Sequence, residues 1–151
     1  MSDGLTQLFI EAMAKHLPPS ASQLNLLDIG GQAGEVLREL RDDLHVIAVS
    51  SDVKTWDEAV SMGSIDAVVA FDHRPDDQFY RAVLRVMRAG GRLIMVNPRG
   101  QVSEHDGRQL ENEGYTRILI ETAVASPLPV GVLIRGEKPH TTSDTLERVQ
   151  K

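Results

Sequence analysis

The sequence contains no cysteine, which excludes disulfides, thiolate metal sites and a cysteine nucleophile. Its five histidines show no metal-ligand spacing, and neither a Gly-x-Ser-x-Gly elbow nor a Gly-Lys-Ser/Thr phosphate loop occurs. No apolar run approaches the roughly 18 to 20 residues that a membrane-spanning helix needs, and the start lacks the basic and then hydrophobic layout of a secretory signal. We therefore expect a cytoplasmic protein with no membrane association.

The composition is that of an ordinary folded protein, with 41% hydrophobic and 25% charged residues. The net charge is -6, from 22 acidic and 16 basic residues, so the chain as a whole would repel a phosphate backbone and no nucleic-acid partner is expected. A length of 151 residues suits one domain. We place that domain at 1–138 and expect a flexible C-terminal tail at 139–151, which has little to bury.

The apolar pattern alternates between helical and strand-like segments. Residues at three- and four-residue spacing predict helices at 3–17, 35–43, 53–62, 76–91 and 103–114. Short apolar runs predict strands at 23–30, 45–51, 64–71, 92–97, 115–123 and 130–137, the last two forming a hairpin. This order predicts an α/β fold of three layers, a mostly parallel sheet with helices on both faces and one antiparallel strand from the hairpin. A ligand would then lie at the carboxyl ends of the strands.

Several segments resemble the class I S-adenosylmethionine-dependent methyltransferases. LLDIGGQAGEV at 26–36 resembles that family's first motif, an acidic residue and spaced glycines between a strand and a helix. SIDAVVAF, VLRVMRAGGRLIMVNP, LENEGYTRILIETA and GVLIRGEKP then resemble later strands and helices in the same order, and the likeness covers roughly residues 5 to 138. The resemblance implies a Rossmann-like methyltransferase fold and S-adenosylmethionine as cofactor.

The same resemblance implies a set of cofactor-binding residues. The first motif would line the methionine end of the cofactor with a carboxylate and backbone amides, and the ends of the next two strands would lie beside the nucleoside. The residues concerned are Asp28, Gly30, Gly31, Gly34, Ser50 and Phe71.

The sequence departs from the family's pattern at three places. Gln32 replaces the middle glycine of the first motif, and Ser50 stands where an acidic residue would hold both ribose hydroxyls, with Asp52 two positions later. Losing that carboxylate would cost a few kcal/mol, or on the order of a hundredfold in affinity. The segment before residue 64 is also too short for the family's third strand, so we expect that strand and its adenine-binding residue to be missing.

Some residues have both a functional and a structural interpretation. Asp72 and His73 follow the strand at 64–71, where this family places catalytic groups, and a histidine there could act as a general base. The same DHRPDD segment equally suits a solvated loop that caps the next helix. Asp28 could likewise serve only to cap the helix after the glycine turn. Trp56 and Met62 fall at helical spacing and are expected to pack in the core.

Three functions follow from these observations. The leading hypothesis is a minimal methyltransferase that acts on an unidentified small-molecule or protein acceptor. The alternative is a pseudoenzyme, a non-catalytic interaction or accessory module with weak or no cofactor binding, in which a second copy or a partner protein covers the sheet edge beside the second strand. An NADP-binding Rossmann domain, with Ser50, Ser51 and Lys54 near a phosphate, fits the glycine spacing less well.

Overall fold

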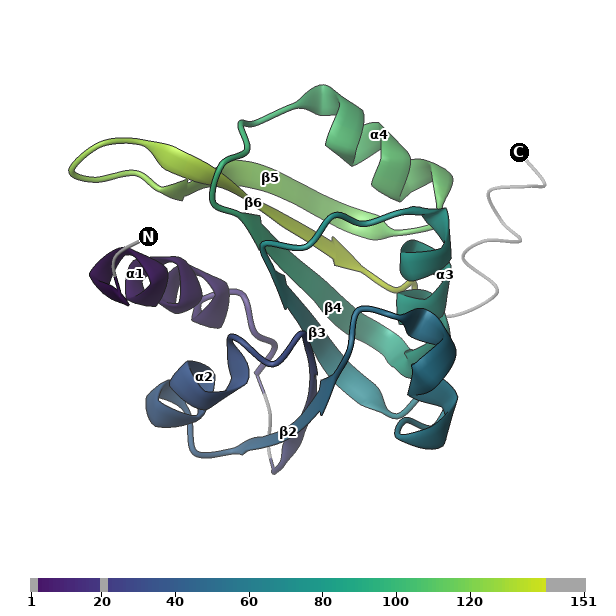
Figure 1. Ribbon diagram of the computed structural model, residues 1–151. Coiled ribbons are helices and arrows are strands. Elements are labelled where there is room, and N and C mark those ends of the chain that lie inside the picture. Colours follow the sequence, from purple (N-terminus) through teal and green to yellow (C-terminus); the bar gives the residue numbers. More distant parts are fainter. Residues whose placement is uncertain (1–2, 20–21, 141–151) are drawn as a thin grey trace.

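The chain folds into an open sheet with helices on both faces (Figure 1), as seen in a computed structural model that describes residues 3–19 and 22–140. In chain order the elements are α1 (Asp3–Ala14), β1 (Leu24–Ile29), α2 (Gly34–Leu40), β2 (Leu44–Val49), the 3₁₀ helix η1 (Val53–Glu58), β3 (Ile65–Phe71), α3 (Asp77–Val86), β4 (Met87–Asn97), α4 (Glu104–Asn112), β5 (Thr116–Val124) and β6 (Val130–Glu137).

The six-stranded sheet has the order β2-β1-β3-β4-β6-β5. The first four strands in that order are parallel, and β6 runs antiparallel to both of its neighbours. This confirms the expected mostly parallel sheet with one antiparallel strand. In the described part of the chain only η1 lies between β2 and β3, so no strand stands where the methyltransferase family has its third strand, as expected.

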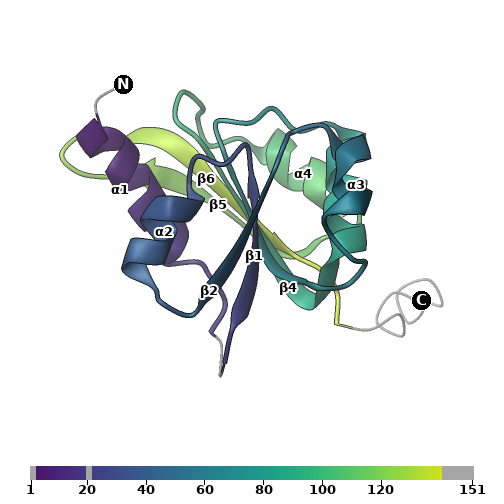
Figure 2. The same cartoon turned by 60° about the horizontal axis from the view of Figure 1, so that its bottom comes forward.

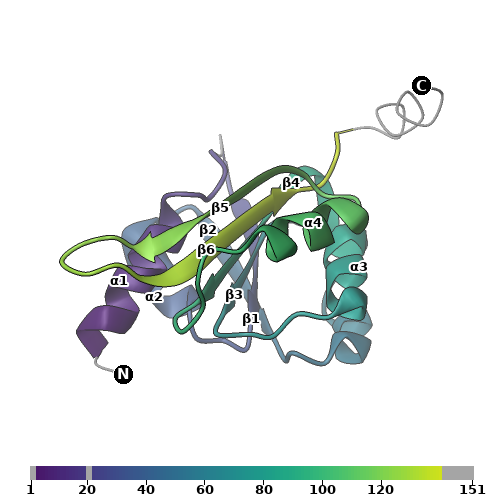
Figure 3. The ribbon, with the colours of Figure 1, turned by 90° about the horizontal axis from the view of Figure 1, so that it is seen from above.

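The helices form two layers, one on each face of the sheet. Helices α1 and α2 lie together on one face, and α3, α4 and η1 cover the other (Figures 2 and 3). Because the central strands are covered on both sides, the run 67–70 of β3 is completely buried, at 0% exposure. This double burial explains why β3 reads in the sequence as a continuous apolar run.

The helix expected at 53–62 is shorter than predicted. It is the 3₁₀ helix η1, which Asp52 caps by accepting a hydrogen bond from the Lys54 backbone N–H. The Trp56 indole N–H donates to the Ser50 carbonyl at 2.9 Å, which draws the buried ring under the turn. Trp56 therefore packs as expected, whereas Met62 lies beyond η1 and is 75% exposed, so its predicted place in the core was wrong.

The helix expected at 76–91 ends earlier, because its last residues join the sheet. Asp76 caps α3 through the Phe79 N–H, but Met87 already pairs with Ile65 of β3. Gly90 adopts a φ of +80° and donates its N–H to the Lys138 carbonyl. The double glycine thus bends the start of a strand instead of ending a helix.

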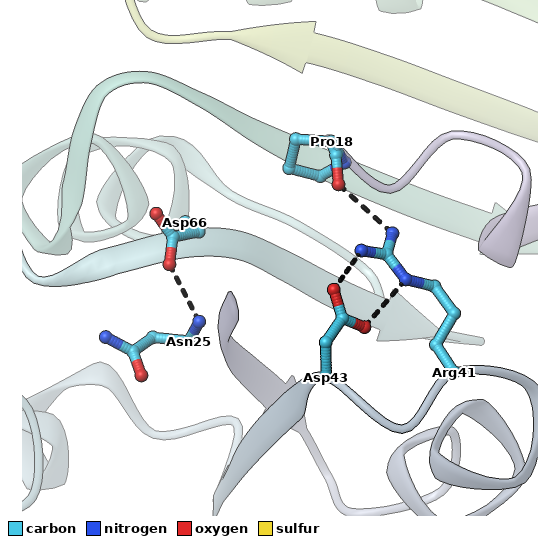
Figure 4. A network of polar contacts seen from close by, with 5 residues as sticks. All are labelled: Pro18, Asn25, Arg41, Asp43 and Asp66. Carbon is cyan, nitrogen blue, oxygen red and sulfur yellow. Dashed lines mark hydrogen bonds and ion pairs between the residues drawn. The ribbon is translucent and has the colours of Figure 1, made fainter. Parts of the chain in front are cut away.

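Polar contacts fix the amino ends of the parallel strands (Figure 4). Asp66, just inside β3, accepts the Asn25 N–H of β1 at 2.7 Å and also pairs with Arg88. Arg41 donates to the Asp43 carboxylate and, at 3.0 Å, to the Pro18 carbonyl. These contacts hold β1, β2 and β3 in register, so that their carboxyl ends lie side by side.

The closing hairpin agrees with the sequence, and Ser103 caps α4. Strands β5 and β6 pair antiparallel, and the Ser103 hydroxyl accepts the His105 N–H at the start of α4. The expected flexible tail falls mostly on 141–151, which lies outside the described residues. The domain limits therefore remain a prediction.

Candidate functional site

The sheet brings the sequence-predicted site residues to one edge. The parallel strands β1, β2, β3 and β4 all end there, and the turns that follow them carry the glycines, Ser50, Asp72 and His73. Backbone bonds tie the turns to neighbouring strands: the Gly30 N–H donates to the Val49 carbonyl and the Asp72 N–H to the Val96 carbonyl, each at 2.8 Å. Residues far apart in the chain thus share one edge.

The turn after β1 requires glycine for two different reasons. Gly30 and Gly31 have φ values of +84° and +74°, which side chains rarely adopt. A Cβ at Gly30 would meet nothing within 4 Å, so the backbone there faces open space. At Gly34 a Cβ would lie 2.7 Å from both the Asp28 carboxylate and Val46, so the start of α2 can approach β1 and β2 only without a side chain.

Asp28 is buried beneath this turn, at 2% exposure. Its Oδ2 accepts the Gly34 N–H at 2.8 Å, and its Oδ1 has no partner among the described residues. Burial raises the pKa of the Asp28 carboxyl, which the backbone N–H groups of Gly34 and Ala33 partly oppose. The structural interpretation of Asp28 therefore holds for one carboxylate oxygen, while the other is buried without a hydrogen-bond partner among the described residues.

The turn after β2 is already satisfied internally. The Ser50 hydroxyl accepts the Asp52 N–H at 3.1 Å and lies 3.2 Å from the Thr55 hydroxyl. Asp52 Oδ1 accepts the Lys54 N–H and so caps η1. The end of β2 thus carries a serine instead of a carboxylate, and Asp52, two residues later, uses one of its oxygens for the cap. Gln32, the other departure from the family's pattern, is exposed beside the turn.

The turn after β3 contains the predicted catalytic residues in different environments. Phe71 is half-buried and its ring packs 6.0 Å from that of Phe9, on the α1 side of the sheet. Asp72 is exposed, with a φ of +56°. The His73 ring stacks 4.4 Å from the Phe79 ring, and its Nε2 is buried with no hydrogen-bond partner in the described chain. Burial lowers the pKa of His73, against the opposing charge of Asp76, which favours the neutral imidazole.

His73 lines a cavity of about 100 Å³, which lies between the ends of β3 and β4, the start of β6 and α4. Its polar lining, besides His73, comes from Tyr80, Asn97, Gln101 and Asp106. None of these four was among the sequence-predicted site residues. A signal was present only for Asn97, the last residue of the strand next to that of His73.

The described residues hold no group of three or more histidine, aspartate or glutamate side chains that could bind a metal ion. Among the described helices, none is long and apolar enough to cross a bilayer.

Comparison with solved structures identifies the architecture. A chain from the complex between the Haloferax volcanii Trm112 methyltransferase activator and its presumed methyltransferase superposes with a TM-score of 0.70 at 11% identity, covering 91% of this chain and 92% of that one. A SAM-dependent methyltransferase from Archaeoglobus fulgidus gives 0.66 at 13% identity, covering 91% and 95%. This chain has the fold of a class I S-adenosylmethionine-dependent methyltransferase. The methyltransferase-like fold is therefore shown, as the motifs indicated.

A third similar structure is larger. Haemonchus contortus phosphoethanolamine N-methyltransferase 2, bound to phosphomonomethylethanolamine and S-adenosylhomocysteine, gives a TM-score of 0.63 at 13% identity. The likeness covers 86% of this chain but only 52% of that one. No family model and no curated protein matches the sequence, so the methyltransferase-like likeness lies in the fold and not in a close sequence relationship.

Proposed function

We propose that this chain binds S-adenosylmethionine at the turn after β1 and catalyses methyl transfer to a small acceptor beside His73. The observation that carries the proposal is the unpaired Oδ1 of buried Asp28 beneath two left-handed glycines that face open space. A buried carboxylate oxygen without a partner costs stability, and a ligand ammonium group would satisfy it.

The residues fit the two halves of the cofactor unequally. The methionine half would lie against Asp28 and the amides of Gly30 and Gly31, where backbone and carboxylate are both available. The ribose half meets Ser50 instead of a carboxylate at the end of β2, and both Ser50 and Asp52 already make hydrogen bonds within their own turn. We therefore expect binding that depends mainly on the glycine turn. When bound, S-adenosylmethionine supplies an electrophilic methyl group.

His73 is the group that could accept a proton from the acceptor. His73 lines the cavity, and its Nε2 has no hydrogen-bond partner in the described chain. Burial lowers the pKa of His73, which favours the neutral imidazole that a general base needs. Asn97, Gln101 and Asp106 offer hydrogen bonds to a polar acceptor in the same cavity. A cavity of about 100 Å³ holds a group of only a few heavy atoms.

The second candidate function is a non-catalytic module, and the turn after β2 favours it. Ser50, Thr55 and Asp52 are joined by hydrogen bonds within the turn, and the end of β2 carries a serine where a ribose-binding carboxylate would stand. A protein retained for its surface would not need that carboxylate. The two functions differ in one measurable property, the binding of the methyl donor or its product.

The first experiment is calorimetric titration with S-adenosylmethionine and S-adenosylhomocysteine. One-to-one binding with a dissociation constant below about 1 mM, equivalent to about 4 kcal/mol, would support the proposal. Ser50→Asp should tighten this binding by about tenfold to a hundredfold, because a carboxylate takes charge-assisted bonds from ribose hydroxyls. If neither wild type nor a folded Ser50→Asp variant releases heat up to millimolar ligand, the non-catalytic function replaces the proposed one.

A matched pair of variants separates a lost site from a weakened fold. Gly30 and Gly63 both have positive φ, +84° and +67°, and a Cβ at either meets nothing within 4 Å. Alanine should therefore introduce a similar backbone strain at each of the two positions, about 1–2 kcal/mol. Only Gly30 lies at the site, so Gly30→Ala should weaken binding while Gly63→Ala leaves it unchanged. Equal binding by both variants would contradict the assignment of the site.

A further inference from the structure

We propose that two copies of this chain pair through their β2 strands, antiparallel, about a two-fold axis that passes through Val46. Strand β2 is one margin of the sheet, at its lower edge in Figure 1 and beside β1 alone. No described residue pairs with its outer side. This inference concerns an interface and is independent of the proposed methyl transfer.

The two margins of the sheet are built differently. At the opposite margin, β5 has a register shift between Thr116 and Leu119, a left-handed Arg117 with φ of +48°, and an exposed Glu121 paired with His16. Bulges and charges of this kind prevent edge-to-edge pairing. Strand β2, LHVIAV, has no bulge, no proline and no acidic, lysine or arginine residue, and all its residues are in register with β1. Only the β2 margin is left suitable for another strand.

The backbone of β2 determines which groups face outward. The carbonyls of Asp43 and Val49 accept the N–H groups of Leu24 and Gly30, so the odd-numbered residues of β2 turn their peptide groups toward β1. Since peptide direction alternates along a strand, the N–H and C=O groups of Leu44, Val46 and Ala48 point away from the sheet. These are the groups that a second strand would bind.

The outward groups are self-complementary in an antiparallel register. In an antiparallel pair, residues that face each other exchange both backbone bonds. With the two-fold axis at Val46, Leu44 faces Ala48 of the second copy, Val46 faces its own equivalent and Ala48 faces Leu44. Moving the axis to Ile47 would require the Ser50 carbonyl, which already accepts the Trp56 indole N–H. Pairing about Val46 uses every outward group and no occupied one.

The side chains agree with this register. Facing residues lie on the same side of a sheet, so Leu44 and Val46 would meet Ala48 and Val46 of the second copy as an apolar row. On the other side His45 faces Ile47, and no like charges within the strand oppose each other. A second copy is favoured over an unrelated strand because LHVIAV satisfies all of these conditions by itself.

Sedimentation velocity of the purified full chain at about 1 to 500 μM tests the proposal. A strand pair with a small interface predicts a micromolar dissociation constant, so the mean mass should rise with concentration from 16.6 kDa toward twice that value. A constant monomer mass over the whole range would overturn the proposal, whether or not the protein binds the methyl donor.

Variants at one exposed position locate the interface. Ala48→Pro removes an outward N–H that makes no bond to β1, and extended backbone before it tolerates proline, so dimerisation should weaken at least tenfold. Ala48→Ser keeps that N–H and should dimerise as wild type does. If Ala48→Pro fails to fold, His45→Lys, which adds an exposed charge facing Ile47 of the second copy, should weaken the dimer instead. Dimers unchanged by every folded variant would overturn the assignment to β2.

Discussion

Replacing Gly34 by alanine should destabilise the fold more than any other glycine-to-alanine change in a helix of this chain. The new Cβ would lie 2.7 Å from the Asp28 Oδ2 and 2.7 Å from the Val46 Cγ1, and Asp28 is buried while Val46 is half-buried. The start of α2 must therefore move away from β1, which breaks the buried bond from the Gly34 N–H to Asp28.

The expected cost follows from two contributions. Overpacking of a buried site costs about 1–3 kcal/mol. Losing a hydrogen bond to a charged group costs about 1.5–3 kcal/mol, and the better helix propensity of alanine returns up to about 1 kcal/mol. The net loss is about 1.5–6 kcal/mol, which lowers the melting temperature of a domain of this size by about 3–24 °C.

Urea and thermal unfolding monitored by circular dichroism would measure this loss. Gly4→Ala is the matched control, because Gly4 is helical and exposed and a Cβ there meets nothing within 4 Å. Its melting temperature should stay level or rise. If Gly34→Ala were as stable as the Gly4 variant, the close approach of α2 to Asp28 would be refuted, and with it the geometry of the glycine turn.

Three further predictions concern other parts of the fold. Burial lowers the pKa of His73, so on acidification the unfolded state takes up a proton before the folded state does. The free energy of unfolding should therefore fall as the pH drops below about 6.5. His73→Phe should reduce this loss, measured as the difference between urea midpoints at pH 7 and pH 5. Asp66→Ala should cost about 1–3 kcal/mol by leaving the Asn25 N–H unpaired, whereas an unchanged urea midpoint would contradict that contact. Tyr115→Phe should cost about 1 kcal/mol, since its hydroxyl donates to the Tyr80 carbonyl in the core; equal melting temperatures would show that bond to be dispensable.

The candidate site was only partly predictable, and the reason differs from residue to residue. Asp28 and the glycines lie close together in sequence, so one motif contained the whole turn. His73 was found because it directly follows a predicted strand. Its neighbours in the cavity, Tyr80 and Asp106 among them, come from two different helices, and no local pattern indicates which faces of two helices converge. The catalytic assignments remain predictions.

The sequence by itself determined the order of helices and strands, the parallel sheet with its closing hairpin and the missing strand, because hydrophobic periodicity and glycine positions are local properties. Long-range pairing decided the rest. Met87, predicted to be helical, belongs to β4 because it pairs with Ile65 of β3. The helix predicted at 53–62 is the shorter η1, in which the Trp56 indole bonds to the Ser50 carbonyl. Whether Ser50 and Asp52 are free for a ligand, and which edge of the sheet stays open, were likewise decided by contacts that exist only in the folded chain.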